Sequence, residues 1–295
     1  MRTTSHNKYH TTTIMEDVLR QAAQKAIASW QAEDETCDAV HEDCAFWVTN
    51  RSPPSFGQGQ RPAAFLPRAL ADTIRITDVK ILSHQSAAAV QVTIGDDACY
   101  YKGFIVFLKQ GNGADAVWQA ISVGLSPPTV PVLPAHFDAV TALTWKGYCH
   151  ASRICDGKLM AEYFHETCRL TFTDVSSSSS SSQQHPKKIV VIDAPTFYGM
   201  VQNRYTTVAL HAPYRHIGHD HALVGQFDSL LSIDFVSPTL ALVLLRVGHP
   251  PCLWTDLLTC ACDEAGRWWI VHKSSENDPY LLEYAKNDDD DDDDS

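Results

Sequence analysis

Asp256 is the side chain of this chain best suited to acid–base chemistry. It lies in an apolar stretch, 253–262, that is typical of a β-strand, and strict alternation places Trp254 and Leu258 on its own side. A carboxylate surrounded by tryptophan and aliphatic side chains has a raised pKa, which suits a general base near neutral pH. Asp256 is therefore the first candidate for a catalytic residue.

The partner of Asp256 depends on how its strand pairs with the next one. If the intervening turn pairs Cys262 with Arg267, Asp256 faces Lys273 and the two form a structural ion pair. If the register differs by one residue, His272 lies on the face of Asp256 and the two form an acid–base dyad. We favour the ion pair, and both arrangements stay open at the level of the sequence.

His165 is the third candidate for acid–base chemistry, and His41 lies at the equivalent place in a similar stretch. Either ring could act in a pocket, or it could satisfy backbone groups at the end of a helix. Because both stretches contain the histidine while their surroundings diverge, we favour the structural role. Four aromatic side chains are candidates for lining a pocket: Tyr148, Tyr163, Tyr198 and Trp254.

No metal or cofactor site is predicted. Residues 211–221 contain four histidines and an aspartate, but their spacing matches no zinc motif, and a polar loop is the simpler interpretation. The sequence contains no glycine-rich nucleotide-binding pattern and no serine-hydrolase pattern. The nine cysteines are odd in number, and we expect free, mostly buried thiols in a reducing, cytoplasmic compartment.

Positioning these residues requires a scaffold, and the sequence contains one scaffold twice. The stretch Val40–Phe46 (VHEDCAF) returns 124 positions later as Phe164–Leu170 (FHETCRL). A second pair of similar stretches closes each copy, Val117–Ile121 and Arg267–Val271. Self-similarity of this kind predicts two copies of one fold, each of about 120–140 residues.

Each copy is predicted to contain a long helix, a short helix and a run of antiparallel strands. In the first copy we expect helices at 14–30, 37–40 and near 65–71, and strands at 45–49, 74–83, 87–94, 101–109 and 117–123. In the second we expect helices at 137–154, 158–164 and 194–201, the last capped by Asp193, and strands at 169–174, 188–192, 230–236, 240–247, 253–262 and 268–274.

This order of elements predicts the α+β class: two cone-shaped domains, each a long helix packed across a strongly curved antiparallel sheet, with a pocket at the wide end. The predicted parts are a flexible N-terminus (1–13), a divergent first cone domain (14–125), a proline-rich linker (126–134), a second cone domain (135–277) with a serine-rich loop (176–182), and an acidic disordered tail (278–295).

Four landmarks of the second copy occur in a recognisable order: Tyr163–Leu170, Phe197–Asn203, Trp254–Leu258 and Gly266–Lys273. They resemble the lumazine-binding-like group of the nuclear-transport-factor-2-like superfamily, which also contains SnoaL-like polyketide cyclases, scytalone dehydratase and ketosteroid isomerase. The resemblance covers about residues 136–276. It implies a cone-shaped α+β fold that pairs through the outer faces of its sheets, either within one chain as a pseudo-dimer or between chains as a homodimer.

The first copy resembles the group less closely. It contains His41 to Cys44 and Trp118, but it lacks the third helix, and Lys102–Phe104 stands where the second copy has its aspartate-containing strand start. Binding of lumazine itself does not transfer from this resemblance, because one fold supports many functions.

Charge and hydropathy exclude some partners. The net charge is −12, of which seven charges come from the aspartate run 288–294, so the folded part is only mildly acidic and has no basic stripe. This argues against nucleic acid as a partner. No segment reaches the roughly 18 apolar residues that a membrane span needs, so we expect no membrane insertion.

Three functional hypotheses remain. The leading one is a small-ligand-binding or assembly protein with no assignable reaction, whose second copy holds a small apolar ligand. The alternative is a cofactor-independent lyase or isomerase (a dehydratase, cyclase or ketosteroid-isomerase-like enzyme) that moves a proton on an apolar substrate, with Asp256 as base and His272 or His165 as its partner. The third is a protein-interaction adaptor that uses the acidic tail. The sequence leaves open whether the protein is an enzyme.

Overall fold

The computed structural model describes residues 5–32, 37–48, 55–58, 74–81, 86–95, 100–111, 116–126, 131–174, 188–204, 227–249 and 252–278. Several predictions concern other residues and lie outside this description: residues 127–130 of the proline-rich linker, the serine-rich loop, the histidine-rich stretch 211–221, the helix near 65–71 and the acidic tail beyond Asp278. The chain divides into two compact units, Met1–Pro128 with Thr173–Ile189, and Thr129–Phe172 with Val190–Ser295.

The first unit is a helix packed on a six-stranded sheet. Its elements are α1 (Ser5–Ala32), β1 (Val40–Val48), β2 (Ser55–Gln58), β3 (Ile74–Ile81), β4 (Ala87–Gly95), β5 (Tyr100–Gln110) and β6 (Val117–Ser126). The strand order is β2-β1-β6-β5-β4-β3. Leu19, Ala23, Ala26 and Ile27 recur at helical spacing on one face of α1, and all four are fully buried against the apolar side chains of the sheet.

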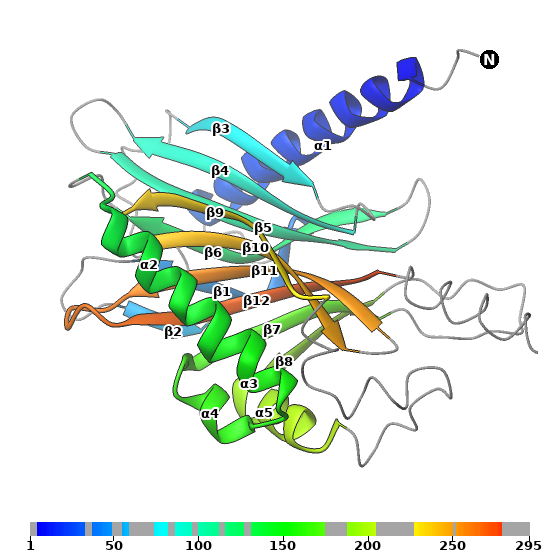
Figure 1. The fold of residues 1–295 in the computed structure, drawn as a ribbon. Helices are drawn as coiled ribbons and strands as arrows, with labels where there is room; N and C mark the ends of the chain where they lie inside the picture. Colours follow the sequence, from blue (N-terminus) through cyan, green and yellow to red (C-terminus); the bar gives the residue numbers. More distant parts are fainter. Residues whose placement is uncertain are drawn as a thin grey trace, which may run out of the picture. The chain divides into compact units, whose positions relative to one another are not determined.

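The second unit has the same plan (Figure 1). The helices α2 (Pro134–Ala142), η4 (Leu143–His150, a π-helix) and α3 (Ala151–Arg153) follow without a break and form one rod. The elements that follow are α4 (Gly157–Ala161), β7 (Phe164–Asp174), β8 (Lys188–Asp193), α5 (Ala194–Gln202), β9 (Ser229–Ser237), β10 (Leu240–His249), β11 (Cys252–Cys262) and β12 (Trp268–Asp278). The strand order, β8-β7-β12-β11-β10-β9, repeats that of the first sheet.

Strand pairing confirms that the two units are copies of one fold. In the first, Val40 pairs with Ala120 and, after an irregularity, Ala45 pairs with Ser122. In the second, Phe164 pairs with Ile270 and then Arg169 with His272, which is the same pattern displaced by 124 and 150 positions. The tryptophans Trp118 and Trp268, which lie at equivalent positions near the start of β6 and β12, are both buried. The predicted α+β class is thereby confirmed.

The structure confirms most elements of the second unit, including the cap of α5, where the Asp193 carboxylate accepts the Thr196 N–H at 2.8 Å. It corrects the sheets in one respect: they are not wholly antiparallel, because β1 pairs in parallel with β6 and β7 with β12. Each parallel pair joins strands that are far apart in the sequence, so no turn between them indicates that they are neighbours in the sheet.

The structure of the first unit differs from the predicted elements in three places. Residues 37–40 do not form a helix; a turn leads into β1, whose pairing with β6 outweighs local preference. Strand β2 was not predicted. The predicted first helix begins at residue 14, whereas α1 begins at Ser5, because a helix that is nucleated by its apolar part can propagate into a polar stretch without an apolar pattern.

Candidate functional site

Asp256 lies on β11 inside the apolar core of the second unit, and its side chain is fully buried. Its Oδ1 accepts a hydrogen bond from Lys273 Nζ at 2.9 Å, and its Oδ2 accepts one from the Tyr148 hydroxyl at 2.5 Å. Lys273 Nζ also donates to Ser275 Oγ. We call Tyr148, Asp256, Lys273 and Ser275 the buried polar cluster.

The ion pair favoured from the sequence is therefore present, although the predicted register is wrong. At the turn Cys262 pairs with Trp268, one residue away from the prediction, and a β-bulge farther along shifts the pairing by one residue more, so that Asp256 pairs with Ser275. Lys273 lies two residues before Ser275, on the same face, and reaches Asp256 diagonally across the two strands. Because side chains alternate between the two faces of a strand, two shifts of one residue each return Lys273 to the predicted face.

The π-helical segment η4 carries Tyr148 to the carboxylate. Segments of this kind are rare, are less favourable than α-helix and are frequently found at functional sites. Burial, and after it the charge of Asp256, raises the pKa of the Tyr148 hydroxyl well above its ordinary value. The phenol therefore stays protonated and donates a charge-assisted hydrogen bond to Asp256.

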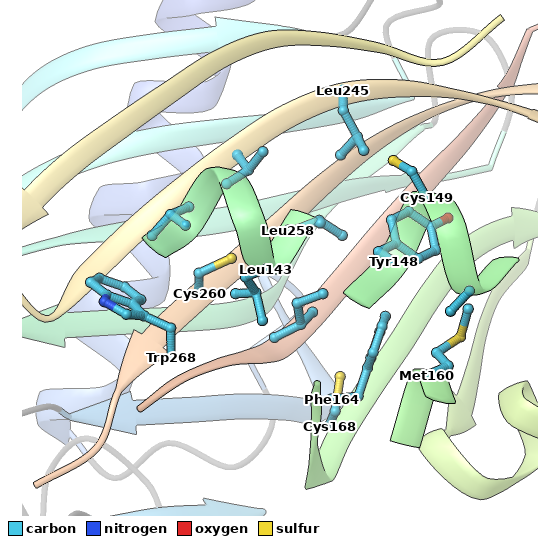
Figure 2. Close-up of a cluster of buried hydrophobic side chains, with 14 of the residues drawn as sticks. Leu143, Tyr148, Cys149, Met160, Phe164, Cys168, Leu245, Leu258, Cys260 and Trp268 are labelled. Carbon is cyan, nitrogen blue, oxygen red and sulfur yellow. The ribbon is translucent and has the colours of Figure 1, made fainter. Parts of the chain in front are cut away.

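Aromatic rings surround the charged end of Lys273. Nζ lies 5.5 Å from the ring centroid of Tyr148 and 5.6 Å from that of Phe197. Phe164 packs against both rings, with centroids 5.8 Å from each. Figure 2 shows Tyr148 and Phe164 among the other apolar side chains of this core, such as Leu258. Such surroundings hold little water, so the ion pair is only weakly screened and each charge depends on its partner.

The structure does not bring His272 to Asp256. His272 and Lys273 are neighbours on β12, so their side chains point to opposite faces of the sheet. Nε2 of His272 lies 3.4 Å from Thr171 Oγ1. Burial, and after it the charge of Lys273, lowers the pKa of His272 to about 3, so the ring is neutral at pH 7. The acid–base dyad between Asp256 and His272 is not formed.

His165 is also separate from the buried polar cluster. Its Nδ1 lies 2.9 Å from Thr167 Oγ1 and accepts the Thr167 backbone N–H at 3.3 Å. Its ring meets Trp269 edge-on, with centroids 5.8 Å apart, and burial lowers its pKa. These contacts organise the start of β7, as the structural interpretation of this histidine expects.

The other aromatic candidates have different surroundings. Tyr163 packs closely on the rod, because a Cβ added at Gly147 would lie 2.3 Å from the Tyr163 ring. Trp254 packs edge-on against Phe172, with centroids 6.5 Å apart. Tyr198 is the one of the four predicted pocket residues that lines the groove described next.

A groove of about 630 Å³ lies between α4, the turn that precedes it, and α5. Its lining residues are Ile154, Cys155, Asp156, Gly157, Lys158, Ala161, Tyr198, Gly199 and Gln202. No residue of the buried polar cluster lines it, so we treat the groove and the cluster as separate places in the second unit.

The first unit builds the same sheet without the cluster. When the two sheets are matched by their strand pairings, Gly103 of β5 corresponds to Asp256 of β11, and Val123 of β6 corresponds to Lys273 of β12. A Cβ at Gly103 would lie 2.0 Å from the Gly124 carbonyl oxygen, so no side chain fits there. The absence of the aspartate from the first copy, inferred from the sequence, is confirmed, and the fold itself does not need the charged pair.

Reasoning from the sequence missed the bond between Tyr148 and Asp256 and the role of Ser275. The apolar helix pattern marked Tyr148 as a pocket candidate, but its bond to β11 depends on the π-helical turn and on packing between distant segments. Among the described residues, no group of three or more histidine, cysteine or acidic side chains could hold a metal ion. No helix of the described part of the chain is long and apolar enough to cross a membrane.

No protein-family model matches this chain, and no curated protein matches it. Solved structures similar to it include an NTF-2-like protein of unknown function from Silicibacter pomeroyi, with 17% identity and a TM-score of 0.36, over 49% of this chain and 97% of that one. An NTF2-like protein of unknown function from Shewanella baltica has 16% identity and a TM-score of 0.38, over 51% and 99%. A ketosteroid isomerase-like protein from Erwinia carotovora atroseptica has 11% identity and a TM-score of 0.33, over 49% and 98%.

Each of these chains is similar to about half of this one. They assign no reaction or ligand to this chain.

Proposed function

We propose that the protein binds a small, largely apolar ligand in its second unit, and that Lys273 anchors an oxygen acceptor of that ligand. One observation carries the proposal. The Lys273 ammonium has three N–H donors, and the described residues supply acceptors for two of them, Asp256 and Ser275. Buried donors in proteins are normally satisfied, so the third donor calls for an acceptor such as a ligand hydroxyl or carbonyl oxygen.

The surroundings of Lys273 define the rest of the ligand. The rings of Tyr148 and Phe197 lie beside Nζ, and the other side chains of this core are apolar. The Lys273 side chain is 7% exposed, whereas that of Asp256 is fully buried, so a ligand would approach the ion pair from the side of the lysine. An apolar molecule with a single acceptor suits such a place better than a strongly charged one.

A purely structural role for the cluster explains it less well. Bringing a carboxylate and an ammonium into an apolar core costs several kcal/mol per ion before their attraction is counted, and a well-packed apolar pair is often as stable. The first unit forms the same sheet with Gly103 and Val123 at these positions. The charged pair is therefore a property of the second unit and not a requirement of the fold.

The enzymatic alternative, a cofactor-independent lyase or isomerase, receives less support. Both oxygens of Asp256 already accept hydrogen bonds, and neither His272 nor His165 reaches the carboxylate. Asp256 would have to release a donor before it could accept a proton from a substrate. The adaptor hypothesis depends on the acidic tail, which lies outside the described residues. Intramolecular or homodimeric pairing, the domain boundaries and the cytoplasmic location stay predictions.

Native mass spectrometry of the purified full chain tests the proposal. We expect a small molecule with a hydroxyl or carbonyl group to be retained by the wild type and by the control Lys146→Met, which removes an exposed lysine of the same rod. The Lys273→Met variant should lose it. Because a single substitution in an ion pair can unfold the unit, the variant Tyr148→Phe/Asp256→Leu/Lys273→Met, which removes the polar ends together, should also lose it while staying folded. Equal retention by these variants, or no retained compound in any sample, would contradict the proposal.

A further inference from the structure

We infer that the groove between α4 and α5 is a second binding site, for a small uncharged aromatic compound that carries a hydroxyl or carbonyl group. The groove holds about 630 Å³, within the roughly 300–1,000 Å³ that is usual for small-molecule pockets. It lies apart from the buried polar cluster, so this inference does not depend on ligand binding at Lys273.

Two glycines shape the groove in opposite ways. A Cβ at Gly157 would lie 2.6 Å from the Tyr198 carbonyl oxygen, so glycine here lets α4 approach the backbone of α5 closely. A Cβ at Gly199 would meet no atom within 4 Å, so the wall of α5 opens into free space at that point. The two helices are thus held together while room for a ligand remains beside Gly199.

Tyr198 supplies an aromatic wall. Its ring packs edge-on against Phe164, with centroids 6.2 Å apart, which fixes the ring between the core and the groove. The side chain is half-buried, and burial raises the pKa of its hydroxyl, so the phenol stays neutral and can both donate and accept a hydrogen bond. A flat ring beside Tyr198 would gain stacking or edge contacts.

Gln202 supplies neutral polar recognition. Its Oε1 accepts the backbone N–H of Gly157 at 3.2 Å, which ties α5 to the start of α4 and uses the oxygen end of the amide. Gln202 is exposed, and no described residue accepts a hydrogen bond from its amide N–H donors, which can therefore meet an acceptor on a ligand. Together with the Tyr198 hydroxyl they match a hydroxyl or carbonyl group on the ligand.

The charges that line the groove select against ions. The Asp156 carboxylate accepts the N–H groups of Lys158 and Leu159 at 3.0 and 2.9 Å and so caps α4. Asp156 and Lys158 contribute one carboxylate and one ammonium to the lining, so its formal charges cancel. A charged ligand would lose hydration and gain attraction from one group while the other repels it.

Three probes of one size and different charge test the inference: benzyl alcohol, benzoate and benzylammonium. Each is titrated into the full chain labelled with ¹⁵N-glycine, which limits the spectrum to at most the 14 glycines. The signal that Gly199→Trp removes identifies Gly199. We expect benzyl alcohol to shift this signal, and benzoate and benzylammonium to bind weaker by roughly fivefold or more.

A matched pair of variants completes the test. Gly199→Trp fills the groove and should weaken the binding of benzyl alcohol by roughly tenfold or more, whereas Met200→Trp adds the same ring at an adjacent exposed position outside the lining and should leave binding unchanged. The site is refuted if benzyl alcohol leaves the Gly199 signal in place or if both variants bind it equally. The ligand class is refuted if either ion binds as tightly as the alcohol.

Discussion

Breaking the buried ion pair on one side should destabilise the second unit far more than removing it altogether. Lys273→Met leaves the Asp256 carboxylate buried in an apolar core with one remaining donor, Tyr148. The variant Tyr148→Phe/Asp256→Leu/Lys273→Met replaces the same groups by apolar ones of similar size and leaves no buried charge behind.

The magnitudes follow from the burial of both partners. Removing one member of a buried pair costs about 3–5 kcal/mol, because the other charge stays desolvated without compensation. Replacing the whole pair by apolar side chains is close to neutral or stabilises by about 1–4 kcal/mol. A domain of ordinary stability has about 5–15 kcal/mol in total, so the single variant should lose much of it. We therefore expect the single and the triple variant to differ by about 3 kcal/mol or more.

Hydrogen exchange in the full chain, read by mass spectrometry, measures the two units separately. Peptides from β11 and β12 report the second unit, and peptides from β5 and β6 provide an internal reference that the substitutions should not affect. Urea unfolding of the same samples gives the free energy for the transition that changes.

The reasoning is refuted if Lys273→Met alters protection of β11 and β12 no more than Lys146→Met does. It is also refuted if the triple variant is as unstable as the single one, because the cluster would then stabilise the fold through packing or hydrogen bonds that apolar side chains cannot replace.

Three further predictions concern other parts of the molecule. The pKa of His272 is lowered to about 3 in the folded chain, below its ordinary value of 6.5. Below pH 6.5 the unfolded chain therefore binds a proton that the folded chain does not. The free energy of unfolding should fall by about 1.4 kcal/mol per pH unit below pH 6.5, or about 2 kcal/mol by pH 5. In urea titrations His272→Gln should remove this part of the pH dependence; an unchanged slope would contradict the assignment. Gly199→Ala should stabilise α5 by about 0.5–1 kcal/mol in thermal unfolding, whereas Gly157→Ala should destabilise it through the clash with Tyr198, and equal effects would refute the account of α4 and α5. Asp156→Ala should cost about 1 kcal/mol by uncapping α4, and an unchanged melting temperature would show that the cap contributes nothing.

The sequence predicted those elements whose signals are local. The meander from β9 to β12 followed from alternating apolar residues between turns, and α5 followed from the cap at Asp193 and the proline after it. The duplication could also be predicted, because the similar stretches around His41 and His165 occupy equivalent positions and pack in the same way. Element β2 carries no comparable pattern in its four residues; it pairs with β1 at the edge of the sheet.

The candidate site was only partly predictable. Asp256 was identified because a carboxylate in an apolar strand is conspicuous. Lys273 was identified because the next strand of the hairpin, β12, runs back past Asp256. Tyr148 could be marked as a residue of the apolar helix face but not as a hydrogen-bond donor to Asp256. The groove beside Gly199 could not be foreseen, since open space between two helices leaves no trace in the order of residues.

The sequence by itself determined the class of the fold, its repetition and the pairing of a carboxylate with a lysine in the second unit. These features depend on the spacing of apolar residues and on the chemistry of residues close together in the chain. The tertiary structure alone decided which face each member of the cluster occupies. A one-residue bulge in β11 and β12 and a π-helical turn around Tyr148 set these directions. Both are settled by packing between segments distant in the chain, which the periodicity of one segment does not record.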